Sequence, residues 1–362
     1  MSSASVVPLR VAVVGCGAFG RNHLRVYQTL ATSGVPVQVV ALVDPNPGAR
    51  ELAVRDHGLP AFATVADLLA ANLSLDAASV CTPTVHHADS AVALLEAGVD
   101  VLIEKPIAPS LADADRILAA AAGHARVVQV GHLERFNPAV TAALPLLHRP
   151  MFFEAHRLSV FTPRSLDVDV VLDLMIHDLD VVLALADSTV REVRAVGLPV
   201  LSREVDIANA RVEFESGAVA NFTASRVSTE RVRKLRFFQP HQYLSLDFAR
   251  QDLLMIDVTA AASLTPQQLE ALLAGSGKSE VAAAEAKPDR PAGAEHPSAG
   301  LSLRKVPTEP GEPLRLEIEA FLSAVRTRET PRVSGAAARD ALALALAIQD
   351  SIRDHRSRSG LV

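Results

Sequence analysis

The chain has 362 residues, 49% of them hydrophobic, and its 41 acidic and 35 basic residues give a net charge of −6. A chain of this length is expected to form two domains. Its acidic balance excludes a general nucleic-acid surface. No apolar run reaches the roughly 18–20 residues of a membrane span. Two cysteines, Cys16 and Cys81, supply neither a disulfide framework nor a metal cluster, so we expect a protein of the reducing cytoplasm.

A glycine-rich turn ends the first apolar segment, within residues 9–20, and a helical stretch follows it. In such a strand–turn–helix the first glycine permits a tight turn, the second lets a pyrophosphate approach the backbone, and the third allows close packing. The helix N-terminus favours the phosphate charge. The cofactor-binding residues expected here are Gly15, Gly17, Ala18, Phe19 and Gly20.

A carboxylate ends the second apolar segment, residues 37–44. We expect Asp44 to accept hydrogen bonds from an adenosine ribose and to repel a 2′-phosphate. No arginine follows it immediately, so NAD is expected as cofactor in preference to NADP. The alternative is an ordinary turn residue ahead of Pro45-Asn46-Pro47.

Strand and helix signals then alternate up to residue 130, which predicts a doubly wound parallel sheet covered by helices, in a domain of residues 1–131. Helices are expected from residue 47 and over 65–71, 90–97 and 111–122, and strands over 77–81, 101–104 and 126–130. Ligands of such sheets lie outside the carboxyl ends of the strands. The residues expected to face the cofactor from that edge are Thr82, Pro83, His87, Glu104 and Lys105.

The pattern changes to period two after residue 151, which predicts an α+β domain with an open, mostly antiparallel sheet over residues 132–312. Strands are expected over 152–159, 190–200, 207–214, 218–225, 231–238 and 243–247, with a hairpin turn at 215–217. Residues 275–300 are rich in Ala, Glu, Pro and Gly and are expected to form a mobile loop without a function. Residues 313–362 predict helices that pack back onto the first domain.

Lys105 lies between a carboxylate and a proline at a predicted strand end. A cation there can hydrogen-bond a reacting oxygen and stabilise negative charge as it develops. From position alone, a solvated lysine at the start of a loop is an equally good interpretation.

The predicted helix over residues 169–186 carries a polar stripe among apolar neighbours. Asp173 and His177 are spaced i, i+4, and Asp180 continues the stripe. One interpretation is a self-satisfied pair in the core; the other is Asp173 orienting His177 as the general base for a substrate hydroxyl. No second histidine stands at ligand spacing on this helix, so no metal is expected.

Together, the glycine turn, the Glu104-Lys105-Pro106 strand end and the Asp173-x-x-x-His177 helix resemble the Gfo/Idh/MocA family of sugar oxidoreductases. This resemblance spans nearly the whole chain. It implies an N-terminal Rossmann domain, a C-terminal domain with an open sheet, and a nicotinamide cofactor. It also implies that Lys105 and His177 are the catalytic pair, with Asp173 beside the substrate.

A narrower resemblance rests on the segment GHxERFNPA at residues 131–139 and on DVxVxxDLxxHDxD at residues 167–180. Both resemble the UDP-N-acetylglucosamine 3-dehydrogenases of that family. This implies NAD-dependent oxidation of the sugar 3-hydroxyl ahead of transamination, in bacteria for lipid A. Asp169 stands where such relatives often have glycine.

A UDP-linked sugar requires cations for its pyrophosphate, and the planar fork of arginine suits phosphate oxygens. Solvation on an exposed loop explains Arg157 or Arg164 equally well when either is taken alone. Arg135 could instead pair with Glu134 or a helix end. The substrate-binding residues expected are Lys105, Arg135, Asn137, Arg157, Arg164, Asp173 and His177.

Two other functions stay open at this point. The first is oxidation of a free sugar or polyol by the same residues, and the second is an NAD-binding regulator without turnover. A regulator has no need of Lys105, Asp173 and His177 together, which weighs against it. The open sheet of the second domain predicts a homodimer or homotetramer.

Overall fold

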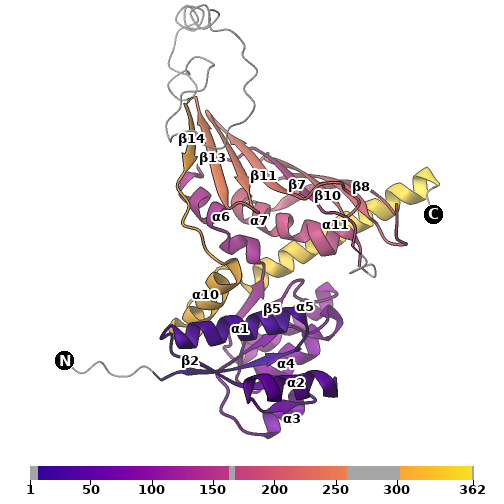
Figure 1. The fold of residues 1–362 in the computed structure, drawn as a ribbon. Helices are drawn as coiled ribbons and strands as arrows, with labels where there is room; N and C mark the ends of the chain where they lie inside the picture. The colour runs from indigo at the N-terminus through magenta and orange to yellow at the C-terminus, as the bar shows by residue number, and fades with distance from the viewer. Residues whose placement is uncertain (1–6, 163–167, 259–301, 361–362) are drawn as a thin grey trace, which may run out of the picture. The chain divides into compact units, whose positions relative to one another are not determined.

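The computed structural model describes residues 7–162, 168–258 and 302–360. The chain divides into two compact units, each described here by itself. The first combines Met1–Phe136 with Gly311–Leu346, and the second combines Asn137–Pro310 with Ala347–Val362 (Figure 1).

The first unit is a parallel sheet with helices on both faces (Figure 1). Its strands, in the order β3-β2-β1-β4-β5-β6, are β1 (Leu9–Val14), β2 (Val37–Val43), β3 (Ala61–Phe62), β4 (Ala77–Val80), β5 (Asp100–Glu104) and β6 (Val128–Gly131). Its helices include α1 (Ala18–Thr32), α2 (Pro47–His57), α3 (Val65–Ala70), α4 (His87–Glu96) and α5 (Leu111–Gly123). The predicted doubly wound sheet is confirmed. Because every strand runs in one direction, their carboxyl ends meet at one edge.

Helix α10 (Pro313–Thr327) belongs to this unit although it lies far along the chain. Its buried residues Ile318 and Phe321 share one hydrophobic cluster with Tyr27 and Leu30 of α1. This spacing of apolar residues, three or four apart, gives the helix a buried face.

Two boundaries differ from the predicted domains. The first unit extends to Phe136 rather than residue 131, because the short helix η2 (Leu133–Phe136) begins with Leu133, which packs on the first core. Helix α11 (Gly335–Ser359) is shared, since it belongs to the first unit up to Leu346 and to the second from Ala347. In the second unit the Ser351 hydroxyl accepts a hydrogen bond from the backbone of Ala195 at 2.8 Å.

The second unit holds an eight-stranded sheet in the order β14-β13-β12-β11-β7-β10-β9-β8. Its strands are β7 (Phe152–Leu158), β8 (Val190–Leu198), β9 (Ile207–Phe214), β10 (Val219–Ser225), β11 (Val232–Gln239), β12 (Gln242–Asp247), β13 (Asp252–Asp257) and β14 (Ser302–Val306). All pairs are antiparallel except β7 with β10. Helices α6 (Pro138–Ala143), α7 (Ile176–Ala186) and the end of α11 lie on one face of it (Figure 1). The predicted mostly antiparallel sheet is confirmed.

A buried ion pair joins this sheet to α7. Arg157 of β7 donates to both carboxylate oxygens of Asp178, at 2.8 and 2.9 Å, and both side chains are almost completely buried. The guanidinium also lies over the ring of Phe248, 5.4 Å from its centroid. Removing one partner of such a pair typically costs about 3–5 kcal/mol, because the other charge stays buried.

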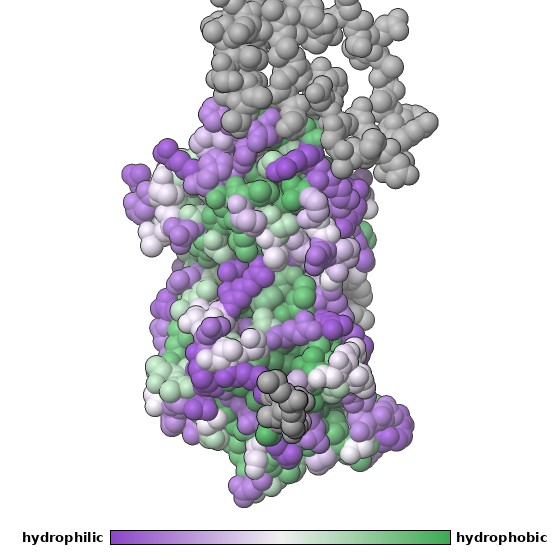
Figure 2. All heavy atoms as spheres, turned by 90° about the vertical axis from the view of Figure 1, so that its left-hand side faces the viewer, coloured by the Kyte–Doolittle hydropathy of each residue, from purple (hydrophilic) through white to green (hydrophobic). Residues whose placement is uncertain are grey.

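The molecular surface mixes polar and apolar areas. Figure 2 shows hydrophobic side chains in several separate areas of the face in view, each bordered by hydrophilic ones. Within the parts of the chain that the structure describes, no helix is both long and apolar enough to cross a membrane.

Candidate active site

The glycine turn has the geometry that a dinucleotide requires. Gly15 has φ +94°, and a Cβ there would lie 2.6 Å from the carbonyl oxygen of Cys81. A Cβ on Gly20 would lie 1.7 Å from the Gly15 oxygen, so neither position tolerates a side chain. At Gly17 a Cβ would enter open space in front of α1. The residues present therefore fit the pyrophosphate of NAD, with exposed Ala18 and Phe19 in the first turn of the helix.

Asp44 lies beside this turn, directly after β2. Its carboxylate accepts hydrogen bonds from the backbone of Cys16 at 2.7 Å and of Asn46 at 2.9 Å. Each oxygen keeps lone pairs for a ribose hydroxyl. An arginine six residues further on lies close by, since Arg50 donates to the carbonyl oxygens of Asp44 and Pro45 at 2.8 and 2.9 Å.

At the end of β4, Thr82 is half-buried and Pro83 is exposed. Among the described residues the Thr82 hydroxyl has no hydrogen-bond partner. His87 is only 1% exposed, and its ring nitrogens lie 2.8 Å from the carbonyl oxygen of Thr82 and 2.9 Å from that of Pro106. Burial lowers the pKa of His87 below its usual value, although its contacts with these two oxygens act in the opposite direction. The placement argues against the predicted contact of His87 with the cofactor, because the ring is buried against the backbone carbonyl oxygens of Thr82 and Pro106.

Glu104, the last residue of β5, turns its carboxylate into the core. Oε1 lies 2.7 Å from Nε2 of His23, and the two side chains are 9% and 0% exposed. This argues against the predicted contact of the carboxylate with the cofactor. Sequence reasoning missed His23, although it lies on the buried face of α1 with Leu24 and Tyr27. A buried histidine needs a polar partner. Its position on the apolar face of a predicted helix was therefore a signal for a buried hydrogen bond.

Lys105 follows at the start of the next loop, where it is half-buried and its peptide bond to Pro106 is cis. It therefore lies at the carboxyl edge of the sheet, as predicted for a group that faces a ligand. Lys105 belongs to the first unit, whereas Asp173 and His177 belong to the second.

The helix that carries Asp173 and His177 does not begin as an α-helix. Its first turn, η4 (Val171–Met175), is π-helical, and α7 starts at Ile176. Turns of this kind occur frequently at functional sites. Asp173 and His177 are both half-buried, whereas Asp180 is buried.

Asp169 holds the entry to this turn. Its Oδ1 accepts hydrogen bonds from the backbone of Val171 at 2.9 Å and of Leu172 at 3.0 Å. Its Oδ2 accepts one from Gln349 of α11. The aspartate that stands where glycine was expected from relatives thus caps the helix and ties it to α11.

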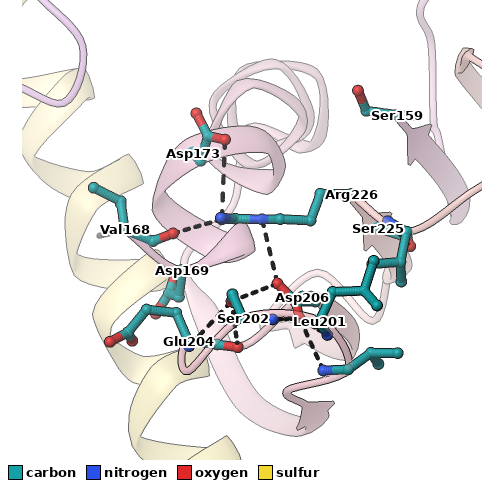
Figure 3. Close-up of polar contacts among 12 residues, drawn as sticks. Ser159, Val168, Asp169, Asp173, Leu201, Ser202, Glu204, Asp206, Ser225 and Arg226 are labelled. Atoms are coloured by element: carbon teal, nitrogen blue, oxygen red, sulfur yellow. Dashed lines mark hydrogen bonds and ion pairs between the residues drawn. The ribbon is translucent and has the colours of Figure 1, made fainter. Parts of the chain in front are cut away.

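Arg226, which follows β10, links Asp173 to the fold (Figure 3). Its Nη2 donates to the carbonyl oxygen of Val168 and lies 4.0 Å from a carboxylate oxygen of Asp173. Its Nε lies 3.8 Å from Oδ1 of Asp206. Sequence reasoning missed Arg226 and Asp206, because no motif marks either residue.

Asp206 is buried, and its negative charge faces the guanidinium of Arg226. Burial acts to raise its pKa, but hydrogen bonds from the Ser202 hydroxyl and from the backbone of Ser202, Val200 and Leu201 lower this pKa to about 2. The carboxylate is therefore ionised at neutral pH, and Arg226 lies between it and Asp173 (Figure 3).

Two of the predicted substrate-binding residues make hydrogen bonds within the fold. Arg157 is committed to Asp178, so leaving this buried pair to bind a pyrophosphate would leave an uncompensated charge. Asn137 accepts a hydrogen bond from the backbone of Ala139, as the cap of α6, and donates to the carbonyl oxygen of Phe248 at 3.0 Å. Both placements argue against the predicted substrate contacts.

Of the other predicted arginines, Arg164 lies outside the described residues. Arg135 is half-buried in η2 and donates to the carbonyl oxygen of Arg332 at 3.2 Å. The guanidinium of Arg332 lies 5.3 Å from the ring centroid of Phe136, and burial, followed by the charge of Arg135, lowers the pKa of Arg332. In residues 7–162, 168–258 and 302–360, no three His, Cys, Asp or Glu side chains are grouped to hold a metal ion.

Comparison with known proteins agrees with this geometry. Residues 9–132 match the oxidoreductase family with an NAD-binding Rossmann fold, and residues 148–239 match the GFO/IDH/MocA C-terminal domain. The chain is 36% identical over 249 residues to the UDP-N-acetylglucosamine 3-dehydrogenase of Acidithiobacillus ferrooxidans, covering 68% of this chain and 77% of that protein. It is 26% identical to the scyllo-inositol 2-dehydrogenase (NAD(+)) of Bacillus subtilis, over 61% of this chain and 68% of that one.

Solved structures give the same family relationship. A crystal form of the Acidithiobacillus ferrooxidans enzyme superposes with a TM-score of 0.79 at 30% identity, covering 96% of this chain and 98% of that one. The WlbA dehydrogenase of Bordetella pertussis, in complex with NADH and UDP-GlcNAcA, shares the fold with a TM-score of 0.71 at 19% identity, over 96% and 97% of the two chains. The glycine turn, the Lys105 strand end and these matches together place the chain in the Gfo/Idh/MocA family, as an NAD-binding dehydrogenase that acts on sugars.

Proposed function

We propose that this protein oxidises the C3 hydroxyl of UDP-N-acetylglucosamine to the 3-keto sugar, with NAD as the oxidant. One observation supports this substrate above others: the 36% identity to a UDP-N-acetylglucosamine 3-dehydrogenase extends over 77% of that enzyme. The half-buried cation at the end of β5 and the half-buried histidine of α7 supply the chemistry.

NAD, when bound, accepts the hydride from the sugar carbon. Lys105 hydrogen-bonds the reacting oxygen and stabilises the negative charge that develops on it. His177 takes the proton of the hydroxyl, a role for which the imidazole of histidine is the side chain most often used. Asp173, placed by Arg226, lies one helical turn before His177 and orients it or the sugar.

The diphosphate requires cationic partners. Arg135 donates to the backbone carbonyl oxygen of Arg332 at 3.2 Å. Burial, and after it the charge of Arg135, lowers the pKa of Arg332, so the two guanidinium groups lie near each other. Two half-buried guanidinium groups of like charge gain stability when an anion neutralises them. We propose that this pair binds the pyrophosphate of the substrate.

The runner-up is a dehydrogenase of a free sugar or polyol, which relatives named inositol dehydrogenases favour. The third candidate is an NAD-binding regulator without turnover.

We propose that the UDP-N-acetylglucosamine oxidation takes place in the cytoplasm, where both free cysteines stay reduced. We expect transamination of the 3-keto product, for lipid A, to follow.

The open face of the second sheet supports self-association. Phe152, Phe238 and Tyr243 form an aromatic cluster there, with ring centroids 5.6 and 4.9 Å apart, and Phe238 is 36% exposed. We propose that a second copy of the chain covers this face, giving a homodimer or homotetramer. Sedimentation velocity of Phe238→Lys should then show dissociation, whereas a wild-type protein that sediments as a monomer would refute the proposal.

The first test of the function compares substrates. UDP-N-acetylglucosamine should give NADH at millimolar concentration or below, because its pyrophosphate adds charge-assisted contacts worth roughly 1.5–3 kcal/mol each. N-acetylglucosamine and myo-inositol at the same concentration should give little or none. Equal or better turnover of a free sugar would select the runner-up, and no turnover with any sugar, despite NAD binding, would select the regulator.

A second prediction concerns the cofactor. Asp44 should make the protein bind NAD more tightly than NADP, because its carboxylate accepts ribose hydrogen bonds and repels a 2′-phosphate. Asp44→Asn keeps the size and one acceptor oxygen but removes the charge. Calorimetric titration should show that the ratio of the Kd for NADP to the Kd for NAD falls roughly tenfold in this variant. Equal affinities in the wild-type protein would remove Asp44 from this role.

A third prediction concerns catalysis. His177→Ala should lower kcat by roughly 10²- to 10⁴-fold while NAD binding is retained, because general-base catalysis typically contributes that much. Lys105→Ala should also lower kcat strongly. The double variant should lose less than the product of the two losses, since both groups act on one hydroxyl. Near-wild-type turnover of His177→Ala across pH, with an unchanged melting transition, would return Asp173 and His177 to the core-pair interpretation.

A further inference from the structure

A row of buried hydrogen bonds between α1, β4 and β5 leads to the end of β5, where Lys105 follows. Tyr27 of α1 lies 2.9 Å from the hydroxyl of Ser79 on β4, and this hydroxyl lies 3.0 Å from Nδ1 of His23. Nε2 of His23 then lies 2.7 Å from the carboxylate of Glu104 on β5. Tyr27, Ser79 and His23 are fully buried, and Glu104 is 7% exposed.

The available donors and acceptors fix which atom donates in each of these hydrogen bonds. In the described residues Ser79 is the one partner of the Tyr27 hydroxyl, so this buried hydroxyl donates to Ser79. Burial also raises the pKa of Tyr27, which keeps its proton on. Ser79 then donates to Nδ1 of His23, which leaves the Nε2 proton for the Glu104 carboxylate.

A glycine closes the other side of this carboxylate. Gly131 of β6 pairs with Glu104 across the sheet. A Cβ built on Gly131 would lie 3.1 Å from Cδ and Oε2 of Glu104 and 3.2 Å from Oε1. The carboxylate is therefore fixed between a hydrogen-bond donor and a close backbone.

The residues on both sides of Lys105 along the chain contact a buried histidine. The preceding residue, Glu104, is bound by His23, and the following residue, Pro106, has its carbonyl oxygen against Nδ1 of His87. Nε2 of His87 lies 2.8 Å from the carbonyl oxygen of Thr82, so the ring packs between the ends of β4 and β5, and its single N–H donates to one of the two carbonyl oxygens.

We propose that His23, through Glu104, is a positioning residue that tethers the backbone at Lys105, with His87 as the second tether. His23 does not touch the reacting atoms; it fixes the backbone from which the Lys105 side chain extends. This inference rests on the proposed function of Lys105. A merely structural histidine would contribute to folding and would leave the placement of this lysine unaffected.

A matched pair of variants separates the two roles. In His23→Gln the side-chain amide replaces Nε2 and can donate to Glu104, whereas in His23→Asn it replaces Nδ1 and reaches only Ser79. Both are neutral amides, so they differ mainly in reach. His23→Asn should lower kcat up to about 10²-fold with little change in the KM for NAD, since a displacement near 1 Å has that effect. His23→Gln should keep kcat within about threefold of wild type.

A variant on the other side of the carboxylate tests the same contact without altering His23. The methyl of Gly131→Ala would press on Glu104 and should lower kcat several-fold, with NAD binding retained. This keeps the inference falsifiable if His23→Asn fails to fold. Equal kcat values for the Asn and Gln variants, or wild-type kcat for Gly131→Ala, would overturn the positioning role.

Amide hydrogen exchange makes the test independent of the substrate. In the NAD-bound full chain, exchange over residues 103–108 should be faster in His23→Asn than in His23→Gln, with residues 37–43 of β2 unchanged. If the wild type oxidises no sugar but this difference is seen, the proposed function fails and the tether stands. Identical exchange in both variants would contradict the tether whatever the substrate is.

Discussion

The hydrogen bond between His23 and Glu104, at 2.7 Å in the core of the first unit, connects the interior of the sheet to its functional edge. A carboxylate buried to this degree needs a donor, because an unpaired buried charge is costly. With His23 in place, Glu104 can end β5 inside the core, and Lys105 emerges at the carboxyl edge. The parallel strand order brings the glycine turn, Asp44 and Thr82 to that same edge.

The need to pair buried charges also governs the second unit. Arg157 and Asp178 satisfy each other, and Asp206 is satisfied by Ser202 and by backbone N–H groups, with Arg226 facing its charge. These contacts tie Arg157 and Arg226 to the segment that carries Asp173 and His177. Arg226 connects a buried structural carboxylate to a predicted site residue, because it faces both Asp206 and Asp173.

The sequence was sufficient for the architecture and for the residues that belong to recognisable motifs. Period-two and alternating patterns predicted both sheets, and the glycine spacing predicted the turn, because these signals are local. Strand β3 has two residues, and β13 pairs with β14 across residues 259–301, so neither pairing has a local signal. The partners of buried charges were not predictable for the same reason. Arg157 had the right chemistry for a phosphate, but only the three-dimensional structure shows Asp178 beside it.

Asp169 shows how structure changes the interpretation of a departure from relatives. In the sequence it was an anomaly at a helix start. In the fold it caps the π-helical turn and binds Gln349 of α11, so a charged residue serves where glycine was expected. Its effect is on the helix that positions Asp173 and His177.

The proposed reaction removes hydride from C3 of the sugar of UDP-N-acetylglucosamine. The most direct measurement uses UDP-N-acetylglucosamine carrying deuterium at C3, incubated with NAD, followed by mass spectrometry of the isolated NADH. We expect the NADH to carry the deuterium, because the hydride comes from C3. Unlabelled NADH, with the deuterium retained at C3 of the sugar, would contradict it.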